Sequence, residues 1–101
     1  MTWLEIISVR TAGATETVEA LDLCRQICRS VAADQPVRVT IYSSTLYATD
    51  FSVHLRWEVD PGGKSVLGTE VSSTLSDFGL INHTLWASRE EYASRRHGSA
   101  R

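Results

Sequence analysis

FSVHLRWEV, residues 51–59, is the stretch that decides the fold of this chain. Apolar residues occupy every second position, and the positions between them hold Ser52, His54, Arg56 and Glu58. Side chains of a β-strand point alternately to the two faces of a sheet. This period of two therefore predicts a strand with one face in the core and His54 and Arg56 on the other face.

A second alternating segment, residues 37–42 (VRVTIY), precedes it. Its apolar face carries two valines and an isoleucine, and its other face carries Arg38, Thr40 and Tyr42. The polar residues 43–50 separate the two segments. We therefore predict an antiparallel hairpin with a loose loop.

Two further strands are predicted near the ends of the chain. Residues 3–10 (WLEIISVR) are rich in β-branched residues, and both of their faces are largely apolar. Residues 80–87 (LINHTLWA) form the last strand. Its outward set remains open between two alternatives: Asn82, Thr84 and Trp86, or Ile81, His83 and Leu85.

Helical spacing appears in residues 15–32, where apolar residues recur every three or four positions. Thr15 or Thr17 is the expected N-cap. Cys24 and Cys28 lie four residues apart on this helix, a geometry that suits a disulfide poorly. Both are expected to be small core residues.

A second helix is predicted after the turn at residues 60–63 (DPGG). Its apolar residues extend from Leu67 to Phe78, Ser65 caps its start, and Gly79 is expected at its C′ position with a left-handed φ. The pattern Ser-x-Glu-Glu at residues 88–91 resembles a capping box and predicts a short C-terminal helix.

The resulting order is β-α-β-β-α-β, which predicts a ferredoxin-like fold of the α+β class. Both helices would cover one face of a four-stranded antiparallel sheet with strand order 4-1-3-2. We expect one domain over residues 1–101, with residues 88–101 as a short C-terminal helix or tail.

Composition excludes several functional classes. A net charge of −2 gives no steering field for nucleic acid or an anionic membrane. No apolar run reaches the roughly 20 residues of a membrane span, and the first residues lack a signal-peptide pattern. The chain is therefore expected to be cytoplasmic. It carries no zinc or hydrolase motif, and we expect no metal and no cofactor.

Residues 58–68 (EVDPGGKSVLG) contain Gly-Lys-Ser, the end of a phosphate-binding P-loop. The full motif requires a glycine five residues before Gly63, and Glu58 stands there instead. A carboxylate would repel phosphates at that position. We therefore interpret the segment as a turn into a helix, with at most a weak anion contact at the helix N-terminus.

The uncovered face of the predicted sheet mixes aromatic, β-branched and titratable residues. A monomer would expose a mixed apolar patch there, which is typical of an interaction surface. We therefore predict a homodimer in which the two sheets pack over one another. Polar residues would pair across the interface or line a cavity between the sheets.

The element order, the strand FSVHLRWEV and the sequence LSDFGLINHTLW (residues 75–86) resemble small dimeric α+β barrel proteins. That group includes proteins of the antibiotic-biosynthesis monooxygenase type and stress-responsive barrel domains, and the resemblance extends from Trp3 to Trp86. It implies a sheet-lined cavity that binds a hydrophobic or aromatic small molecule. Some members oxidise their substrate without a metal and others bind haem, while no catalytic residue can be carried over individually.

Three functions follow as alternatives: a homodimeric binding or assembly module, a small monooxygenase- or isomerase-type enzyme, and an ACT-like sensor of a small ligand. His54 is the candidate general base and Arg56 the candidate anchor for a carboxylate or carbonyl. The candidate ligand-binding residues are Tyr42, Glu58, His83 and Trp86. His83 is also the candidate second base or haem ligand. Each has a simpler alternative in packing, solvation or a cross-strand pair.

Overall fold

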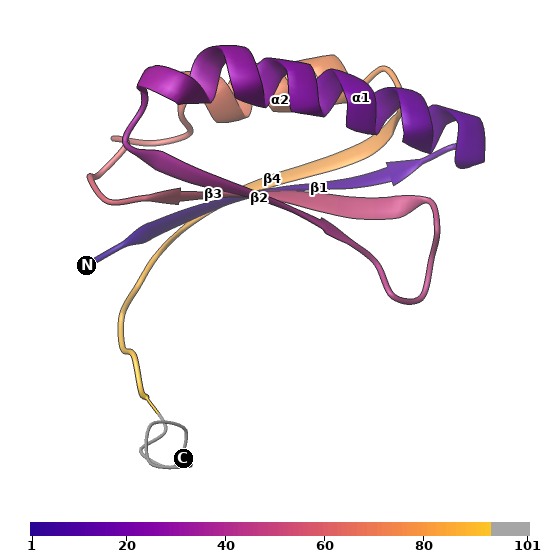
Figure 1. Cartoon of the computed structure of the whole chain (residues 1–101). Coiled ribbons are helices and arrows are strands. Elements are labelled where there is room, and N and C mark those ends of the chain that lie inside the picture. Colours follow the sequence, from indigo (N-terminus) through magenta and orange to yellow (C-terminus); the bar gives the residue numbers. More distant parts are fainter. Residues whose placement is uncertain (94–101) are drawn as a thin grey trace, which may run out of the picture.

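The computed structural model describes residues 1–93 and has the predicted order β-α-β-β-α-β (Figure 1). Its elements are β1 (Trp3–Thr11), α1 (Ala14–Val31), the short 3-10 helix η1 (Ala32–Asp34), β2 (Val37–Ser43), β3 (Asp50–Trp57), α2 (Val66–Leu75) and β4 (Gly79–Ala87). The predicted ferredoxin-like fold is therefore confirmed. No helix of the described part is long and apolar enough to cross a membrane.

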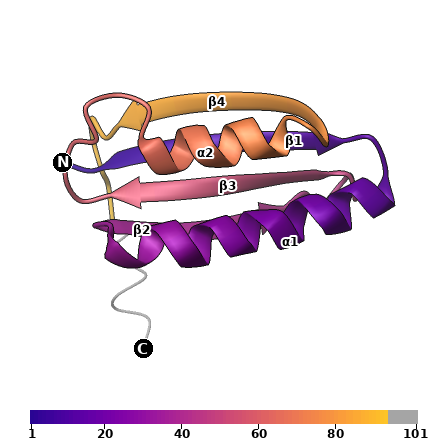
Figure 2. The same cartoon turned by 90° about the horizontal axis from the view of Figure 1, so that it is seen from above.

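The four strands form one antiparallel sheet in the order β2-β3-β1-β4, which is the predicted order read from the other edge. Both helices lie side by side on one face of this sheet, and no helix of residues 1–93 lies on the opposite face (Figures 1 and 2). The sheet therefore has a helix face and an open face.

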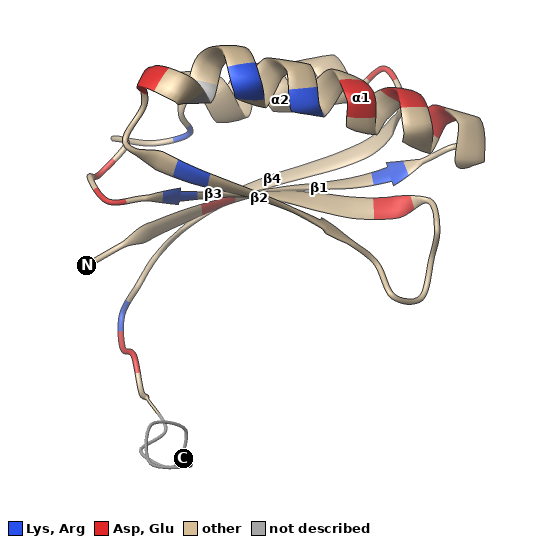
Figure 3. Cartoon of the chain, in the orientation of Figure 1, with Lys and Arg blue, Asp and Glu red and all other residues tan. Residues whose placement is uncertain are grey.

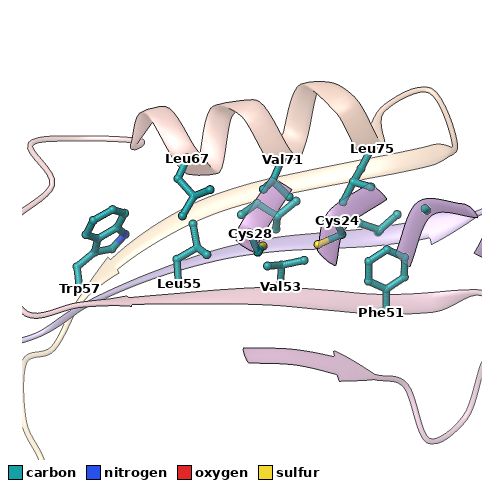
Figure 4. Close-up of a cluster of buried hydrophobic side chains, with 12 residues drawn as sticks. Cys24, Cys28, Phe51, Val53, Leu55, Trp57, Leu67, Val71 and Leu75 are labelled. Carbon is teal, nitrogen blue, oxygen red and sulfur yellow. The ribbon is translucent and has the colours of Figure 1, made fainter. Parts of the chain in front are cut away.

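The core lies between the helices and the alternating apolar residues of β3. Phe51, Val53, Leu55 and Trp57 are all buried, as the period of two predicts. They point towards the apolar residues of α2 and the two cysteines of α1 (Figure 4). Both cysteines are free and buried, so they are the small core residues that the sequence predicts.

The predicted N-cap of the first helix is wrong. The helix α1 begins at Ala14, so Thr15 and Thr17 already lie inside its first turn. Thr17 is buried, and its Oγ1 lies 2.8 Å from Gly13 O and 2.6 Å from Thr11 Oγ1. Its hydroxyl therefore ties the helix to the end of β1 instead of capping free amides.

The predicted start of the second helix is confirmed, whereas its predicted end is wrong. Ser65 is the N-cap of α2, and its side chain accepts a hydrogen bond from Gly68 N. The helix ends at Leu75 with Ser76 as its C-cap, and Gly79 is the first residue of β4 without a positive φ. Gly79 is needed for a different reason, because a Cβ there would collide with the backbone of Arg10.

The helix predicted to begin at Ser88 is absent from residues 88–93. Ser88 N donates to Thr2 O at 2.8 Å, and Thr2 N donates to Ser88 Oγ at 2.9 Å. Ser88 thus continues the pairing of β4 with β1. The rest of the predicted helix, residues 94–101, lies outside the described residues.

Candidate functional site

The open face of the sheet carries four of the six predicted site residues. The strand registers place His54 and Arg56 of β3 beside Tyr42 and Arg38 of β2 on this face. They also resolve the ambiguity of β4: Asn82, Thr84 and Trp86 lie on the open face, and Ile81, His83 and Leu85 lie on the helix face. Tyr42, His54, Arg56 and Trp86 therefore share one surface.

His54 is held between two polar neighbours on the open face. Its ring centroid lies 4.6 Å from that of Tyr42, and its Nε2 lies 3.2 Å from Ser52 Oγ. Partial burial, and secondarily the nearby positive charge of Arg56, lower the pKa of His54 below its ordinary value of 6.5. The imidazole is therefore neutral at pH 7, which is the state that a general base requires.

A hollow of about 510 Å³ lies at one end of the open face; Tyr42 belongs to its lining, whereas His54, Arg56 and Trp86 do not. Tyr42 and Ser52, the two neighbours of His54, belong to its lining. The remaining lining residues are Ser8, Val9, Arg10, Ser43, Ser44, Asp50, Phe51, Leu80, Ile81 and Asn82. The hollow thus combines apolar surface with hydroxyl and amide groups, as small-molecule sites generally do.

An ion pair closes one side of this hollow. Arg10 donates to both carboxylate oxygens of Asp50, with Nη2 2.8 Å from Oδ2 and Nε 3.0 Å from Oδ1. The hydrogen bond and charge of Arg10 hold the pKa of Asp50 below its ordinary value. The Arg10 guanidinium also lies 5.6 Å from the centre of the Tyr47 ring. These contacts fix the position of a charged group at the edge of the hollow.

Two arginines face each other at the opposite end of the open face. Arg38 and Arg56 are direct cross-strand partners, and neither forms an ion pair within residues 1–93. Basic segments of β2 and β3 accordingly lie at the same end of the sheet (Figure 3). Like charges in this arrangement repel, so this end of the face favours an anionic group from outside the chain.

The structure does not bring Glu58 and His83 to this surface. Glu58 follows the last residue of β3 and is exposed. His83 lies on the helix face, where its side chain is 8% exposed and its Nε2 lies 2.6 Å from Glu5 Oε2. Both residues remain candidates by sequence only, and neither touches the hollow.

Sequence reasoning missed a buried polar cluster centred on Glu5, which we call the Glu5 cluster: Glu5, Trp57, Ser65 and His83. Glu5 Oε1 accepts from Trp57 Nε1 at 3.1 Å and from Ser65 Oγ at 2.6 Å. Glu5 Oε2 accepts from Ser65 N at 3.0 Å and from His83 Nε2. The one available signal was a carboxylate among Trp3, Ile7 and Val9 on an otherwise apolar strand face.

The Glu5 carboxylate remains ionised despite its burial. Burial raises the pKa of Glu5, but hydrogen bonds from Ser65, His83 and Trp57 outweigh it and leave the pKa below its ordinary value of 4.5. Gly68 makes room for the carboxylate, because a Cβ at that position would collide with it. The N-terminus of α2 therefore already holds an internal anion, which agrees with the rejection of a P-loop.

Comparison with solved structures shows which proteins share this architecture. A conserved protein from Methanosarcina mazei Go1 matches with a TM-score of 0.71 and 11% identity, over 88% of this chain and 94% of the other. A monooxygenase from Streptomyces coelicolor, solved in complex with nanaomycin D, matches with a TM-score of 0.67 and 13% identity, over 91% of each chain.

SnoaB from Streptomyces nogalater, a cofactor-independent oxygenase, matches with a TM-score of 0.62 and 12% identity, over 92% of this chain and 98% of the other. No protein-family model and no curated protein sequence matches the chain. At these identities the likeness concerns the fold. The resemblance suggested by the sequence is thus confirmed at that level: the chain has the ferredoxin-like fold of antibiotic-biosynthesis monooxygenase-like proteins.

Proposed function

We propose that this protein is a homodimeric small-molecule-binding module whose two open sheet faces pack together over the hollow. The observation that carries the proposal is the set of exposed apolar side chains on the open face. Tyr42 (53% exposed) and Leu80 (76%) line the hollow, and Trp86 (58%) lies further along β4 on the same face, which no helix of residues 1–93 covers. Exposed apolar groups gathered on one face are typical of an interaction surface.

A second copy supplies a natural cover for this face. An interface with two-fold symmetry uses the same surface twice, so a single set of residues provides both halves. Packing two open faces would turn the hollow of each chain into an enclosed cavity. The proposal keeps the cytoplasmic location that the composition predicts.

The chemistry of the hollow favours a hydrophobic or aromatic ligand with a few polar groups. Tyr42 offers an aromatic surface, and Leu80 offers an apolar one. Ser52 and Asn82 offer hydrogen bonds to hydroxyl or carbonyl oxygens. The Streptomyces coelicolor monooxygenase of the same fold was solved with nanaomycin D, which supports a small organic ligand here.

Analytical ultracentrifugation tests the dimer, with Leu80→Asp as the informative variant. A carboxylate in place of this apolar side chain should shift the protein to a monomer, because its cross-strand neighbour Arg10 is already paired with Asp50. Val18→Asp is the matched control, since Val18 is 61% exposed on α1 and lies away from the open face. A wild-type protein that sediments as a monomer at high micromolar concentration contradicts the proposal, as does an equal effect of the two variants.

One observation favours a second candidate function, that of an enzyme that abstracts a proton. His54 is a neutral imidazole whose hydrogen-bond partner Ser52 lines the hollow. In this function the ligand extends from the hollow along the open face to His54, which takes a proton from an activated C–H or O–H, and Arg56, two residues further along β3 on the same face, stabilises the anion that forms. The reaction would be of the cofactor-independent monooxygenase or isomerase type, with a haem-dependent form as the alternative implied by the resemblance.

Hydrogen–deuterium exchange in a bound aromatic ketone or phenol, followed by NMR, tests this enzyme function. His54→Gln should slow exchange by about 100-fold or more, the usual contribution of a general base. Thr40→Val is the control, because Thr40 lies opposite His54 in the ladder and carries no titratable group. Exchange that is unchanged in His54→Gln removes the enzyme function and leaves the binding function in place.

A further inference from the structure

The Glu5 cluster joins four elements through one carboxylate. Glu5 comes from β1, Trp57 from the end of β3, Ser65 from the N-cap of α2, and His83 from β4. The Glu5 side chain is 0% exposed and that of His83 is 8% exposed. Water therefore has little access to replace a broken bond within the cluster.

An ionised carboxylate suits this site because all of its neighbours donate. Each oxygen of Glu5 accepts two hydrogen bonds, which uses its full acceptor capacity. A protonated carboxyl would direct its own hydrogen towards one of these donors and break at least one bond. Such a loss is costly where a buried donor is left without a partner.

The first turn of α2 depends on this carboxylate for its attachment to the sheet. Ser65 donates to Glu5 through both its backbone N and its Oγ, and the same Oγ accepts from Gly68 N at 2.9 Å. Leu67 is buried, but Val66 is 82% exposed, and the preceding residues 58–64 are mostly exposed. Besides the packing of Leu67 in the core, the bonds from Ser65 to Glu5 therefore attach this end of the helix to the sheet.

We propose that Glu5 is an acid-sensitive latch: protonation of its carboxylate releases the first turn of α2 from the sheet while the four strands remain paired. Ser65 faces Glu5 from the start of α2, Trp57 faces it from β3, and His83 from β4. His83 is the one titratable partner of Glu5 within residues 1–93. The latch is a property of the single chain and does not rest on the proposed dimer.

The direction of the pH effect follows from the depressed pKa of Glu5. A carboxyl group with a lowered pKa in the folded state contributes stability that is fully present above its unfolded pKa. That contribution disappears as the pH falls through the lower folded-state pKa. The latch is therefore closed at neutral pH and opens as the pH falls through the folded-state pKa of Glu5, which lies below 4.5.

Amide hydrogen exchange read by mass spectrometry on the full chain tests the latch between pH 7 and pH 3. Protection factors are compared after correction for the intrinsic pH dependence of exchange. We expect peptides covering residues 62–70 to lose about 10- to 100-fold in protection, the effect of losing a charged hydrogen bond, at a pH where β1 and β3 retain theirs. Simultaneous loss in α2 and the strands, or retention in α2, overturns the proposal.

Glu5→Gln provides the variant test. Its side-chain amide cannot accept from all four donors, so residues 62–70 should already exchange faster at pH 7 and change little on acidification. Asp50→Asn is the matched control, since Asp50 also has a lowered pKa but lies beside Arg10 on the open face. An equal effect of the control on α2 overturns the proposal. The wild-type titration decides the matter if Glu5→Gln does not fold.

Discussion

Gly68 occupies its position in α2 because of a residue that is distant in the sequence, Glu5 of β1. Glycine within a helix ordinarily costs up to about 1 kcal/mol relative to alanine. Here the missing Cβ leaves room for the Glu5 carboxylate, which reaches the helix from β1. The same carboxylate explains why Ser65 is buried although it begins a helix at the edge of the molecule. The cost of Gly68 is thus offset by the Glu5 cluster.

Gly68→Ala should therefore destabilise the protein, against the general preference of helices for alanine. Overpacking of a buried site costs about 1–3 kcal/mol, which exceeds the gain in helix propensity. Urea denaturation measures the change in the free energy of unfolding. Ser73→Ala, at an exposed position of the same helix, is the control and should be neutral or slightly stabilising. A stabilised Gly68→Ala variant would contradict the described position of Glu5.

The titration of His54 tests the electrostatics of the open face. Burial is the larger cause of its lowered pKa and Arg56 the smaller, so Arg56→Gln should raise that pKa towards 6.5 without reaching it. Arg38→Gln removes a charge one strand further away and should have less effect. NMR of the His54 ring carbons against pH gives both midpoints. If the titration midpoint of His54 is unchanged in Arg56→Gln, the charge of Arg56 does not contribute to the lowered pKa of His54.

Among the elements, β3 was predictable because a half-buried strand shows its two environments directly in a period of two. The same rule failed to orient β4, since both of its faces carry apolar residues and only its pairing with β1 decides between them. The end of α2 was also missed. Gly79 is typical of a helix C-terminus, yet it serves a close approach to Arg10 that arises from the chain's tertiary arrangement.

The residues of the candidate site also fall into two groups: those whose positions the sequence predicts and those whose positions it does not. The positions of His54 and Arg56 follow from the alternation in β3, and Tyr42 follows from that in β2. The Glu5 cluster gathers residues up to 78 positions apart, and no local pattern records that proximity. The sequence thus predicts which residues lie on the open face, but not the contacts between residues of different elements.

Truncation of two neighbouring residues of β3 should change the free energy of unfolding by very different amounts. Leu55 is 0% exposed in the core, so Leu55→Ala should cost about 2–5 kcal/mol through lost burial and the cavity that remains. Arg56 is exposed on the open face, so Arg56→Ala should change the stability of the monomer by about 0.5 kcal/mol or less. Urea denaturation of both variants checks the alternation. Similar costs at the two positions would contradict it.

At the scale of the whole molecule, residues 1–93 form a two-layer structure with both helices on one side of the sheet (Figure 1). The core lies between the layers, while the open face presents apolar and charged groups that no element of this described part covers. In a chain of 101 residues the single core is modest, so covering this face would add a large share of the buried apolar area. The proposed dimer would therefore contribute to folding stability as well as to ligand binding.

Thermal unfolding should accordingly depend on protein concentration. For a dimer that unfolds to two chains, each tenfold rise in concentration adds about 1.4 kcal/mol of apparent stability and raises Tm by a few degrees. Differential scanning calorimetry over a hundredfold range measures this dependence. Leu80→Asp should abolish it, whereas Val18→Asp should preserve it. A constant Tm for the wild type would speak against association through the open face.

The hydrogen bonds between Thr2 and Ser88 bring the start of β1 and the exit of β4 to one corner of the sheet. A short peptide that replaces residues 89–101 and links Ser88 to Thr2 would join the two ends of the sheet without moving a strand. New ends could then be opened in the exposed connection between β2 and β3, at residues 44–48. Such a circular permutant would put β3 first in synthesis and leave the architecture intact.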